Sequence, residues 1–370
     1  MATMQDVARL AQVSASTVSY VLTGTRPISP ATRDKVLAAM AQLGYQPNAM
    51  ARGLASRRSR ILGLLMPMDE RGLGATETAF VTGAAAAAGA AGYHLVLSPI
   101  GAGDLDELRR LASQRMLDGA LLMEVQLHDP RVDVLREIGV PQVLIGRTAD
   151  TTGLSYVDID FDRTVRDAVG YLVGLGHRRI VYVNHSADAV AAGYGPALRT
   201  RDAFATAMAE HGLTPLTTFA EDSAAGGRAA LATALRLAPD LTAILAMNES
   251  AVFGLLGELT ARGRTVPGDV SVVSMVTSPQ VADLATPALT AMNSPGSALG
   301  RIAIETLLRH VDGGSDEVHQ QLLPCTLEIR GSSGSPRTRS DTARGDGAGG
   351  DPPTPDTEVA RRRAGTRRRA

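Results

Sequence analysis

Residues 3–23, TMQDVARLAQVSASTVSYVLT, decide the fold of the N-terminal part of the chain. Thr3 and Asp6 stand three residues apart, which is the spacing of a capping box at the start of a helix. The apolar residues that follow recur at helical spacing: Val7, Leu10 and Ala11. After a break, Ser14 is placed to cap a second short helix. The stretch therefore predicts two short helices joined by a tight turn.

A third helix is predicted to begin at Pro30, with Ser29 as its N-cap, because proline is favoured in the first turn of a helix. Its buried stripe is expected to contain Val36, Leu37, Met40 and Leu43. Gly44 closes the helix, since glycine readily adopts the left-handed conformation found at many helix ends. The second helix offers a matching stripe of Val18, Val21 and Leu22. The three helices can thus share a small core, and we call residues 1–46 the headpiece.

The other side of the second helix carries small hydroxyl side chains, which can lie close to DNA and bond phosphates or base edges. Ala15 can contact a thymine methyl group. Ser14 and Thr17 are equally well explained as helix caps, whereas Ser16 and Tyr20 are favoured as DNA contacts. The predicted DNA-binding residues of the headpiece are Thr3, Met4, Ser14, Ala15, Ser16, Thr17, Ser19, Tyr20, Ser29 and Thr32.

Charge is divided unevenly along the 370 residues, although the net charge is only −1. Residues 1–60 hold eight Lys or Arg against two Asp or Glu, and residues 331–370 hold nine against five. The 270 residues between them carry −11. A short basic segment beside an acidic body is typical of a phosphate-binding module joined to a domain with another task.

Composition and motifs disfavour several classes of protein. The single cysteine, Cys325, cannot form an internal disulfide, and we find neither a signal peptide nor an apolar run of membrane-spanning length. We therefore expect a cytoplasmic protein with no membrane partner. Since metal-ligand spacing, a phosphate loop, a dinucleotide fingerprint and a GxSxG motif are all missing, we expect no metal, no cofactor and no enzymatic activity. His177 is interpreted as structural, and the acidic clusters at 104–107 and 158–162 as helix-start charges.

From residue 61 to about 330, short apolar runs alternate with amphipathic segments. Strands separated by helices in this way build parallel sheets whose strands are buried on both faces. The length allows two such sheets with a cleft between them, and ligands of such folds bind beyond the carboxyl ends of the strands. The predicted strands are residues 61–66, 93–97, 120–123, 141–145, 180–183, 242–246 and 270–273.

Residues 331–370 are rich in Gly, Pro, Ser, Thr and Arg and almost lack apolar residues, so we predict a disordered basic tail. Its arginine runs at 361–363 and 367–369 either add nonspecific DNA affinity or belong to a dispensable extension. The alanine-rich run 83–92 is predicted to be a closely packed helix, either at a dimer interface or inside one subunit.

Motifs in register along most of the chain are specific enough to indicate a family. The headpiece and the residues after it contain Thr3-Met4-Gln5-Asp6-Val7-Ala8, Thr17-Val18-Ser19, Leu43-Gly44-Tyr45, Pro47-Asn48 and Ala51-Arg52-x-Leu54. Later landmarks are Arg115-x-x-Asp118-Gly119, Gly176-His177-Arg178-Arg179-Ile180 and Val266-Pro267-x-Asp269-Val270-Ser271. Together they resemble the LacI/GalR family of transcriptional regulators. Two departures are Gln12, where the family often has glycine, and Thr23, where it often has asparagine.

The resemblance implies an α/β protein with a three-helix helix-turn-helix headpiece (1–46), a hinge helix (47–59) and a periplasmic-binding-protein-like core (60–330). The core would have two subdomains, 61–158 with 293–320 and 161–290 with 321–330, joined by three crossing strands. The resemblance also implies a homodimer on a near-palindromic operator in double-stranded DNA. The hinge helix would lie in the minor groove, with Leu54 as a wedge between base pairs. In that helix Asn48 would be the cap, Ala51 would allow close approach and Arg52 would supply charge.

By the same resemblance, a small effector that binds in the core cleft controls the affinity for the operator. Repression of transcription is favoured over activation. The implied effector-binding residues are Thr76, Glu77, Arg199, Arg201, Asn248, Glu249 and Val276. Val276 stands where the family has an aspartate, so either Glu77 and Glu249 replace that acceptor or the effector is not a plain sugar. A carbohydrate or a derivative is the favoured effector. An exported solute-binding protein is disfavoured by the headpiece, and a sugar-metabolising enzyme by the lack of a visible nucleophile and base.

Overall fold

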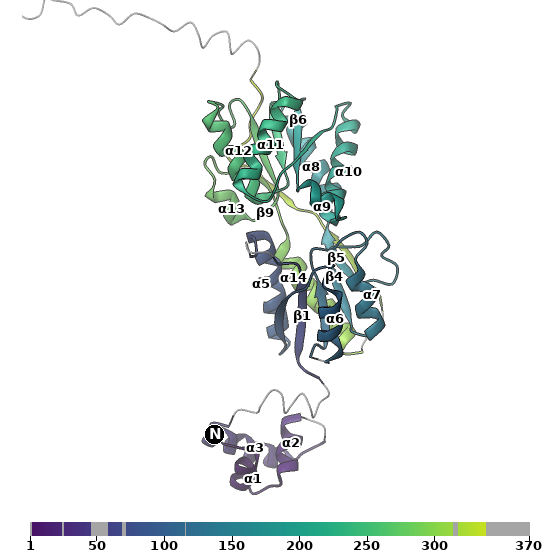
Figure 1. Ribbon diagram of the computed structural model, residues 1–370. Coiled ribbons are helices and arrows are strands. Elements are labelled where there is room, and N and C mark those ends of the chain that lie inside the picture. The colour runs from purple at the N-terminus through teal and green to yellow at the C-terminus, as the bar shows by residue number, and fades with distance from the viewer. Residues whose placement is uncertain are drawn as a thin grey trace, which may run out of the picture.

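The computed structural model describes residues 2–23, 26–45, 58–68, 72–114, 116–313 and 317–337 of the chain. Within these ranges the chain forms a helical headpiece and an α/β core with two sheets (Figure 1). The predicted hinge residues Asn48, Ala51, Arg52 and Leu54 lie outside them, as does the predicted tail beyond Arg337. What we inferred about those residues therefore stays a prediction.

The headpiece consists of α1 (Met4–Ala11), α2 (Ala15–Thr23) and α3 (Pro30–Leu43). The capping box of α1 is present, because the Thr3 hydroxyl accepts the N–H of Asp6 and the Asp6 carboxylate accepts the N–H of Thr3 at 2.9 Å. Ser29 caps α3 through the N–H of Thr32, and Gly44 ends it with φ +59°. The predicted helix boundaries and caps are therefore confirmed.

The headpiece core is narrower than the apolar pattern predicted. It contains Val7, Ala8, Ala11, Val18, Val36 and Ala39. Leu10 and Leu37 were predicted to be buried but are 43% and 46% exposed, so that part of the prediction is wrong. Three short helices bury only a thin stripe each, and small alanines allow close contact where a leucine would hold the helices apart.

The core contains two six-stranded sheets. The first has the strand order β11-β5-β4-β3-β1-β2 and is parallel throughout. The second has the order β12-β10-β9-β8-β6-β7, and only β12 pairs antiparallel, with β10. The strands of the first sheet are β1 (Ile61–Met66), β2 (His94–Pro99), β3 (Gly119–Leu122), β4 (Gln142–Ile145), β5 (Tyr156–Ile159) and β11 (Gln320–Leu323). Those of the second are β6 (Ile180–Asn184), β7 (Leu216–Phe219), β8 (Ala243–Ala246), β9 (Ser271–Thr277), β10 (Thr290–Asn293) and β12 (Thr326–Glu328).

Helices pack against both sheets, and Figure 1 shows them on either side of the strands. The first subdomain has α5 (Ala75–Ala90), α6 (Leu105–Ser113), α7 (Pro130–Ile138) and α14 (Gly296–Val311). The second has α8 (Phe161–Gly174), α9 (Ala187–Ala191), α10 (Gly195–Glu210), α11 (Ala224–Leu237), α12 (Glu249–Ala261) and α13 (Pro279–Leu284). None of the helices described in the structure is long and apolar enough to span a membrane.

The alanine-rich run forms most of α5, and one side of this helix packs on α14 of the same chain. Gly83 and Gly300 allow the contact, since a Cβ at either would lie 2.1 Å from a backbone oxygen of the other helix. Ala85 and Ala86 on the other side of α5 are exposed. The predicted packing inside one subunit is therefore seen, and a second small-residue face stays free for another contact.

The chain passes between the subdomains three times, after β5, after β10 and between β11 and β12. The third crossing lies between Leu323 and Thr326, slightly later than the predicted boundary at residue 320. Strand β11 stays with the first sheet because it pairs along its whole length with β5, from Gln320 opposite Tyr156 to Leu323 opposite Ile159.

Residues 331–337 correct the prediction that the chain is disordered from Gly331 onward. Ser332 is fully buried, accepts the N–H of Val272 at 2.8 Å and donates its hydroxyl to the Val272 carbonyl at 2.6 Å. The buried ring of His177 binds the Gly334 carbonyl and the Thr242 hydroxyl, both at 2.9 Å. Pro336 is the only residue of the segment with an apolar side chain, and hydrogen bonds to the second sheet hold the segment in place. His177 has the structural role that we expected.

Candidate functional site

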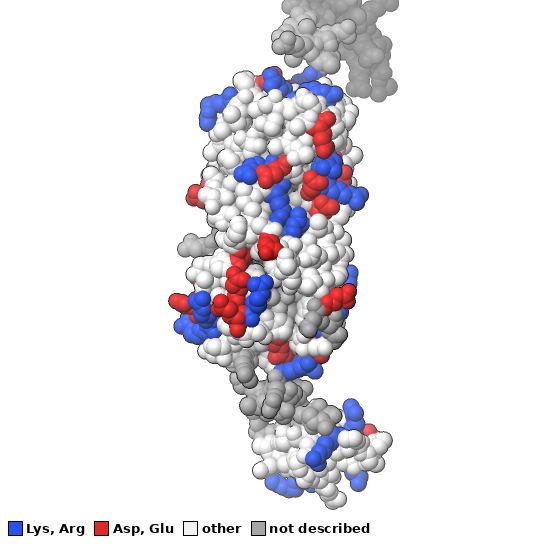
Figure 2. Space-filling view, turned by 90° about the vertical axis from the view of Figure 1, so that its right-hand side faces the viewer, with Lys and Arg blue, Asp and Glu red and all other residues white. Residues whose placement is uncertain are grey.

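The first candidate site is the solvent side of the headpiece helices. On α2, Ser14, Ala15 and Ser16 are exposed, and Ser19 and Tyr20 are half-buried. Of the other predicted DNA-binding residues, Thr3 and Ser29 are exposed, whereas Met4, Thr17 and Thr32 are half-buried. Figure 2 shows Lys and Arg side chains on the visible face of the headpiece with little Asp or Glu among them.

Several of these side chains have partners within the headpiece, among them Ser14 and Tyr20. Ser14 accepts the N–H of Thr17 at 3.1 Å, so it caps α2, and its hydroxyl also lies 2.8 Å from that of Ser16. The guanidinium of Arg26 lies 5.2 Å from the centre of the Tyr20 ring, which places a positive charge beside the end of α2. The helix therefore presents several hydroxyl groups next to the positive charge of Arg26. Such groups can bind DNA phosphates and base edges.

The second candidate site is a cavity of about 610 Å³ between the two subdomains. It lies where the strands of both sheets end, as expected for this class of fold. Of the predicted effector-binding residues, five line it: Thr76, Glu77, Asn248, Glu249 and Val276.

Three of these five residues also join the subdomains on one side of the cavity. The Thr76 hydroxyl donates to the Val276 carbonyl at 3.0 Å. Glu249, at the start of α12, accepts the N–H of Ser278 at 3.1 Å and the N–H groups of Ala75 and Thr76. Those two amides open α5, whose own N-cap has no side chain to satisfy them, so a carboxylate from the opposite subdomain caps the helix.

On the opposite side of the cavity, the backbone joins the subdomains. The loop after β3 meets the loop before α10, with Leu127 donating to the Gly193 carbonyl at 2.8 Å and Gly195 to the Val125 carbonyl at 3.1 Å. Between these bonds, Tyr194 donates its hydroxyl to the Glu124 carboxylate, and both side chains line the cavity. The cavity is thus closed by contacts on two sides.

Arg199 and Arg201 do not line the cavity, so the structure does not support that part of the prediction. The guanidinium of Arg199 donates to the carbonyls of Arg147 at 2.7 Å and Thr148 at 3.2 Å, across the subdomain boundary. Arg201 pairs with Asp202 at 2.8 Å on the outer side of α10. Arg199 is thus held by carbonyl groups of the first subdomain. Arg201 is paired with the exposed residue Asp202.

Among the cavity residues that the sequence did not predict, five are titratable: Glu124, Asp158, His185, Tyr194 and Asp222. For three of them a signal existed, because Glu124, His185 and Asp222 come within three residues of the ends of β3, β6 and β7. Asp158 was misread as a helix-start charge. It lies in β5, is 5% exposed and is 3.4 Å from Arg147, whereas the predicted cap of α8 is supplied by Asp160.

The electrostatics of the cavity are dominated by carboxylates. Burial raises the pKa of Glu124 to about 7, and the nearby charges of Glu77 and Asp222 act in the same direction. Burial likewise raises the pKa of Asp158 to about 6, although Arg147 and Arg199 oppose it. The pKa values of Glu77 and Glu249 are raised by burial, while that of His185 is lowered to about 4. No Lys or Arg is among the described residues that line the cavity.

Asn248 has a local role besides its place on the cavity wall. Its Oδ1 accepts the N–H of Ala251 at 3.0 Å and so caps α12, and its amide donates to the Ala220 carbonyl at 3.3 Å. The described residues contain no cluster of His, Cys, Asp and Glu suited to a metal ion. Carboxylic acids are the commonest polar side chains of the cavity wall.

Family comparisons match both halves of this architecture. The description "Bacterial regulatory proteins, lacI family" matches residues 3–48, and "Periplasmic binding protein-like domain" matches residues 169–333. The HTH-type transcriptional regulator CelR of Thermobifida fusca is 34% identical over 335 residues, which cover 89% of this chain and 98% of that protein. The chain belongs to the lacI family of bacterial regulatory proteins. This regulator thus carries a DNA-binding headpiece on a ligand-binding type of core.

Other relatives and solved structures agree with that assignment. Catabolite control protein A of Priestia megaterium is 28% identical, with 90% of this chain and 99% of that protein covered. The structure of a CelR–cellobiose complex superposes with a TM-score of 0.69 at 30% identity and covers 90% of the regulator and all of that chain. A lac repressor dimer bound to operator and the anti-inducer ONPF gives 0.77 at 25% identity over 90% and 99% of the two chains.

Proposed function

We propose that the regulator is a repressor whose operator affinity is set by an uncharged carbohydrate bound in the cavity between the subdomains. The observation that carries this proposal is the lining of the cavity, in which Glu77, Glu124, Asp158, Asp222 and Glu249 offer acceptors to hydroxyl groups. Such a wall repels phosphate and carboxylate groups, so it disfavours an anionic effector. The cellobiose in the CelR complex points to the same class of ligand.

Thermal-shift measurements with cellobiose, glucose and glucose 6-phosphate test this proposal. We expect at least one neutral sugar to raise the unfolding midpoint, since a ligand at about 100 times its Kd stabilises the folded state by about 2.7 kcal/mol. Glucose 6-phosphate should give no shift. A midpoint raised only by the phosphate would contradict the assignment.

The headpiece is proposed to read the operator through α2, as a homodimer that places two copies on a near-palindromic site. The lac repressor on its operator is a dimer, and the exposed Ala85 and Ala86 face of α5 is suited to close packing between subunits. We infer that Ser16 and Tyr20 contact the DNA directly, that Ser14 is mainly a cap, and that Leu54 is the minor-groove wedge. We infer that the regulator acts in the cytoplasm, beside the chromosome that carries its operator.

Substitutions on α2 separate the DNA interface from the rest of the headpiece. Ser16→Ala is expected to weaken binding to the selected operator about tenfold, while binding to random DNA changes little. Gln42→Ala is the matched control, because Gln42 is also exposed but lies on α3. An operator can be selected from random duplexes and affinities measured by fluorescence anisotropy. An equal loss of affinity for operator and for random DNA would show that Ser16 does not contact the bases.

We infer that the cavity binds its sugar without converting it. CelR and catabolite control protein A are named as regulators, and two of the cavity acids, Glu249 and Glu124, also accept hydrogen bonds from α5 and from Tyr194. Incubating the regulator with cellobiose and following released glucose checks this inference. Release above the buffer blank, lost in Glu124→Gln, would instead show hydrolysis.

A further inference from the structure

We propose that Arg131 and Asp129 form a positioning pair for the cavity. The pair holds the loop between β3 and α7 so that Glu124 faces the ligand and residues 125–127 stay bound to the second subdomain. This inference rests on the proposed function in one respect, namely that the cavity is the effector site. Four features of the loop support this role.

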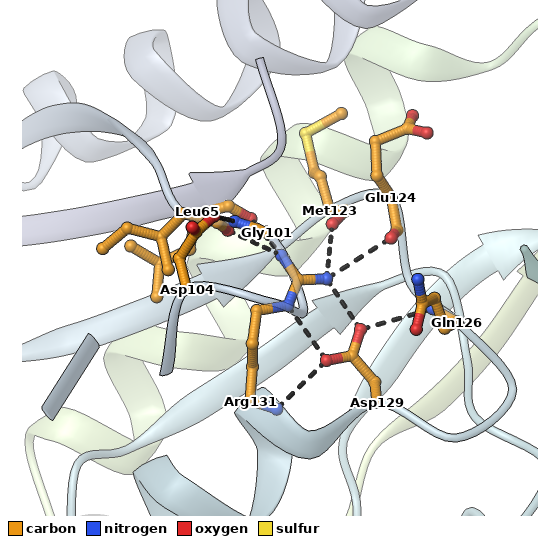
Figure 3. Close-up of polar contacts among 9 residues, drawn as sticks. Leu65, Gly101, Asp104, Met123, Glu124, Gln126, Asp129 and Arg131 are labelled. Carbon is orange, nitrogen blue, oxygen red and sulfur yellow. Dashed lines mark hydrogen bonds and ion pairs between the residues drawn. The ribbon is translucent and has the colours of Figure 1, made fainter. Parts of the chain in front are cut away.

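The first feature is the burial and reach of Arg131. The residue lies in the first turn of α7, yet its side chain is fully buried. Its guanidinium donates to the carbonyls of Leu65 at 3.3 Å, Ile100 at 3.0 Å and Met123 at 2.9 Å (Figure 3). These carbonyls lie at or just beyond the carboxyl ends of β1, β2 and β3. One planar group therefore holds the ends of three adjacent strands beside the cavity.

The second feature is that Asp129 neutralises the charge of Arg131 and also binds the backbone of the loop. Its carboxylate accepts Nε of Arg131 at 2.9 Å and Nη2 at 2.7 Å, and it is only 6% exposed. The same carboxylate caps α7 and accepts the N–H of Gln126 at 3.3 Å. A buried guanidinium needs such a partner, and here the partner also sets the path of the backbone.

The third feature is the conformation of Glu124. Its φ of +54° lies in the left-handed region, which is unfavourable for a residue with a side chain. Arg131 donates to the Glu124 carbonyl at 3.3 Å as well as to that of Met123, so it fixes both sides of the unusual residue. Figure 3 shows the carbonyl of Glu124 turned toward Arg131 and its carboxylate pointing away.

The fourth feature is the bond of the loop to the second subdomain. Directly after Glu124, the backbone of Val125 and Leu127 exchanges hydrogen bonds with Gly195 and Gly193. The Tyr194 hydroxyl between them donates to Glu124. A loop released from Arg131 would thus change the cavity wall and the contact between subdomains together. The pair acts through Glu124 and is itself not in contact with a ligand.

The decisive variant is Asp129→Asn with Arg131→Met. Removing Arg131 alone leaves a buried aspartate unpaired, with an expected loss in Tm on the order of 10 °C. The double variant avoids an unpaired charge, and asparagine still caps α7. Arg136→Met is the matched control, because Arg136 pairs with Asp133 on the exposed side of the same helix.

The first readout is the pH dependence of Tm in the wild type, in Glu124→Gln, in the double variant and in all three substitutions combined. Glu124 faces Glu77 on α5, Asp222 after β7, Tyr194 before α10 and Arg131 on α7. The pKa of Glu124 is raised to about 7 in the folded protein, which means that the fold favours the protonated carboxyl group. Glu124 therefore contributes fully to the free energy of unfolding only below the pKa that it has in the unfolded chain. That contribution is lost as the pH rises through about 7. Glu124→Gln should remove this decline.

The positioning role predicts that the double variant removes at least half of the same decline, because a released Glu124 becomes solvated. The triple variant should then show no further change in the pH profile. An unchanged decline, or one shifted to higher pH, would mean that Glu124 has kept its place and lost only the attraction of Arg131. Either result overturns the proposal.

The second readout is hydrogen exchange at the amides of Leu127 and Gly195. We expect exchange about tenfold faster in the double variant and unchanged in the Arg136→Met control. Unchanged exchange in both variants would reduce the pair to a local ion pair. Neither readout needs a sugar or DNA, so a failure of the carbohydrate assignment in the thermal-shift experiment is a separate result.

Discussion

Gln12 shows how a single backbone angle limits the headpiece. It ends α1 with φ +55°, where a side chain approaches the backbone closely and glycine is free of that conflict. We expect Gln12→Gly to stabilise the headpiece by about 0.5–1 kcal/mol, measured by thermal unfolding followed by circular dichroism. The reverse change, Gly44→Gln at φ +59° in open space, should destabilise it by a similar amount. A lower midpoint for Gln12→Gly would contradict this account.

At the same scale, the sequence predicted cavity residues only where a family motif or a strand end marked them. Thr76, Glu77, Asn248, Glu249 and Val276 reach the cavity. Arg199 does not, because carbonyls of the other subdomain compete for its guanidinium, and local sequence carries no information about that competition. The role of Arg131 could not be predicted for the same reason. An arginine in the first turn of a helix carries no sign that the ends of three strands lie around it.

Among the elements, the packing of α11 on α12 depends on glycines that touch backbone. A Cβ at Gly254 would lie 1.9 Å from the carbonyl oxygen of Ala224, whereas one at Gly257 meets nothing within 4 Å. Both residues lie inside α12. Gly254→Ala is therefore expected to destabilise the core by about 1–3 kcal/mol, and Gly257→Ala to stabilise it by up to about 1 kcal/mol. Chemical denaturation of the two variants checks the opposite signs, and equal signs would refute the packing argument.

Most of the strands that the pattern predicted are buried on both faces, although the partly exposed edge strand β2 was predicted as well. Strands β1, β3 and β8 read as continuous apolar runs and are almost wholly buried. By contrast, β11 (QQLL) and β12 (TLE) lie at sheet edges with alternating exposure, and their residues are too few and too polar to stand out. The pattern also missed β5 and β10, which are short and buried inside the sheets, and the edge strand β7. Burial alone therefore does not decide which strands the sequence reveals.

The segment 331–337 provides a test of hydrogen bonding without apolar burial. Truncation after Arg330 removes the bonds of Ser332 to Val272 and of Gly334 to His177, leaving buried polar groups without partners. We expect a loss of about 2–4 kcal/mol in the free energy of unfolding. Truncation after Arg337 keeps these contacts and serves as the control. Equal stability of the two truncated chains would restore the original prediction of disorder from Gly331.

In the whole molecule, strand β3 connects the two functional regions. Beyond its carboxyl end stands Glu124 in the cavity wall, and immediately before it stands Asp118. The Asp118 carboxylate accepts Ser59 N at 2.7 Å, Ser59 Oγ at 2.8 Å and Arg60 N at 3.0 Å. Ser59 is the last residue of the predicted hinge segment, and Arg60 is the first residue of the core. A displacement of the strand by a ligand would therefore reach the point where the DNA-binding part joins the core.

This arrangement predicts that Asp118→Asn uncouples the two sites while each still binds. An amide replaces one acceptor oxygen, so the three donors can no longer all be satisfied. We expect unchanged affinity for a sugar that gives a thermal shift, but a loss of most of the sugar's effect on operator affinity, where coupling is typically about 1–3 kcal/mol. Asp283→Asn is the control, because that carboxylate pairs with Arg330 in the second subdomain. Operator titrations by fluorescence anisotropy, with and without sugar, measure the coupling. Full coupling in Asp118→Asn would show that the signal reaches the headpiece by another route, such as the ion pair of Arg58 with Asp312.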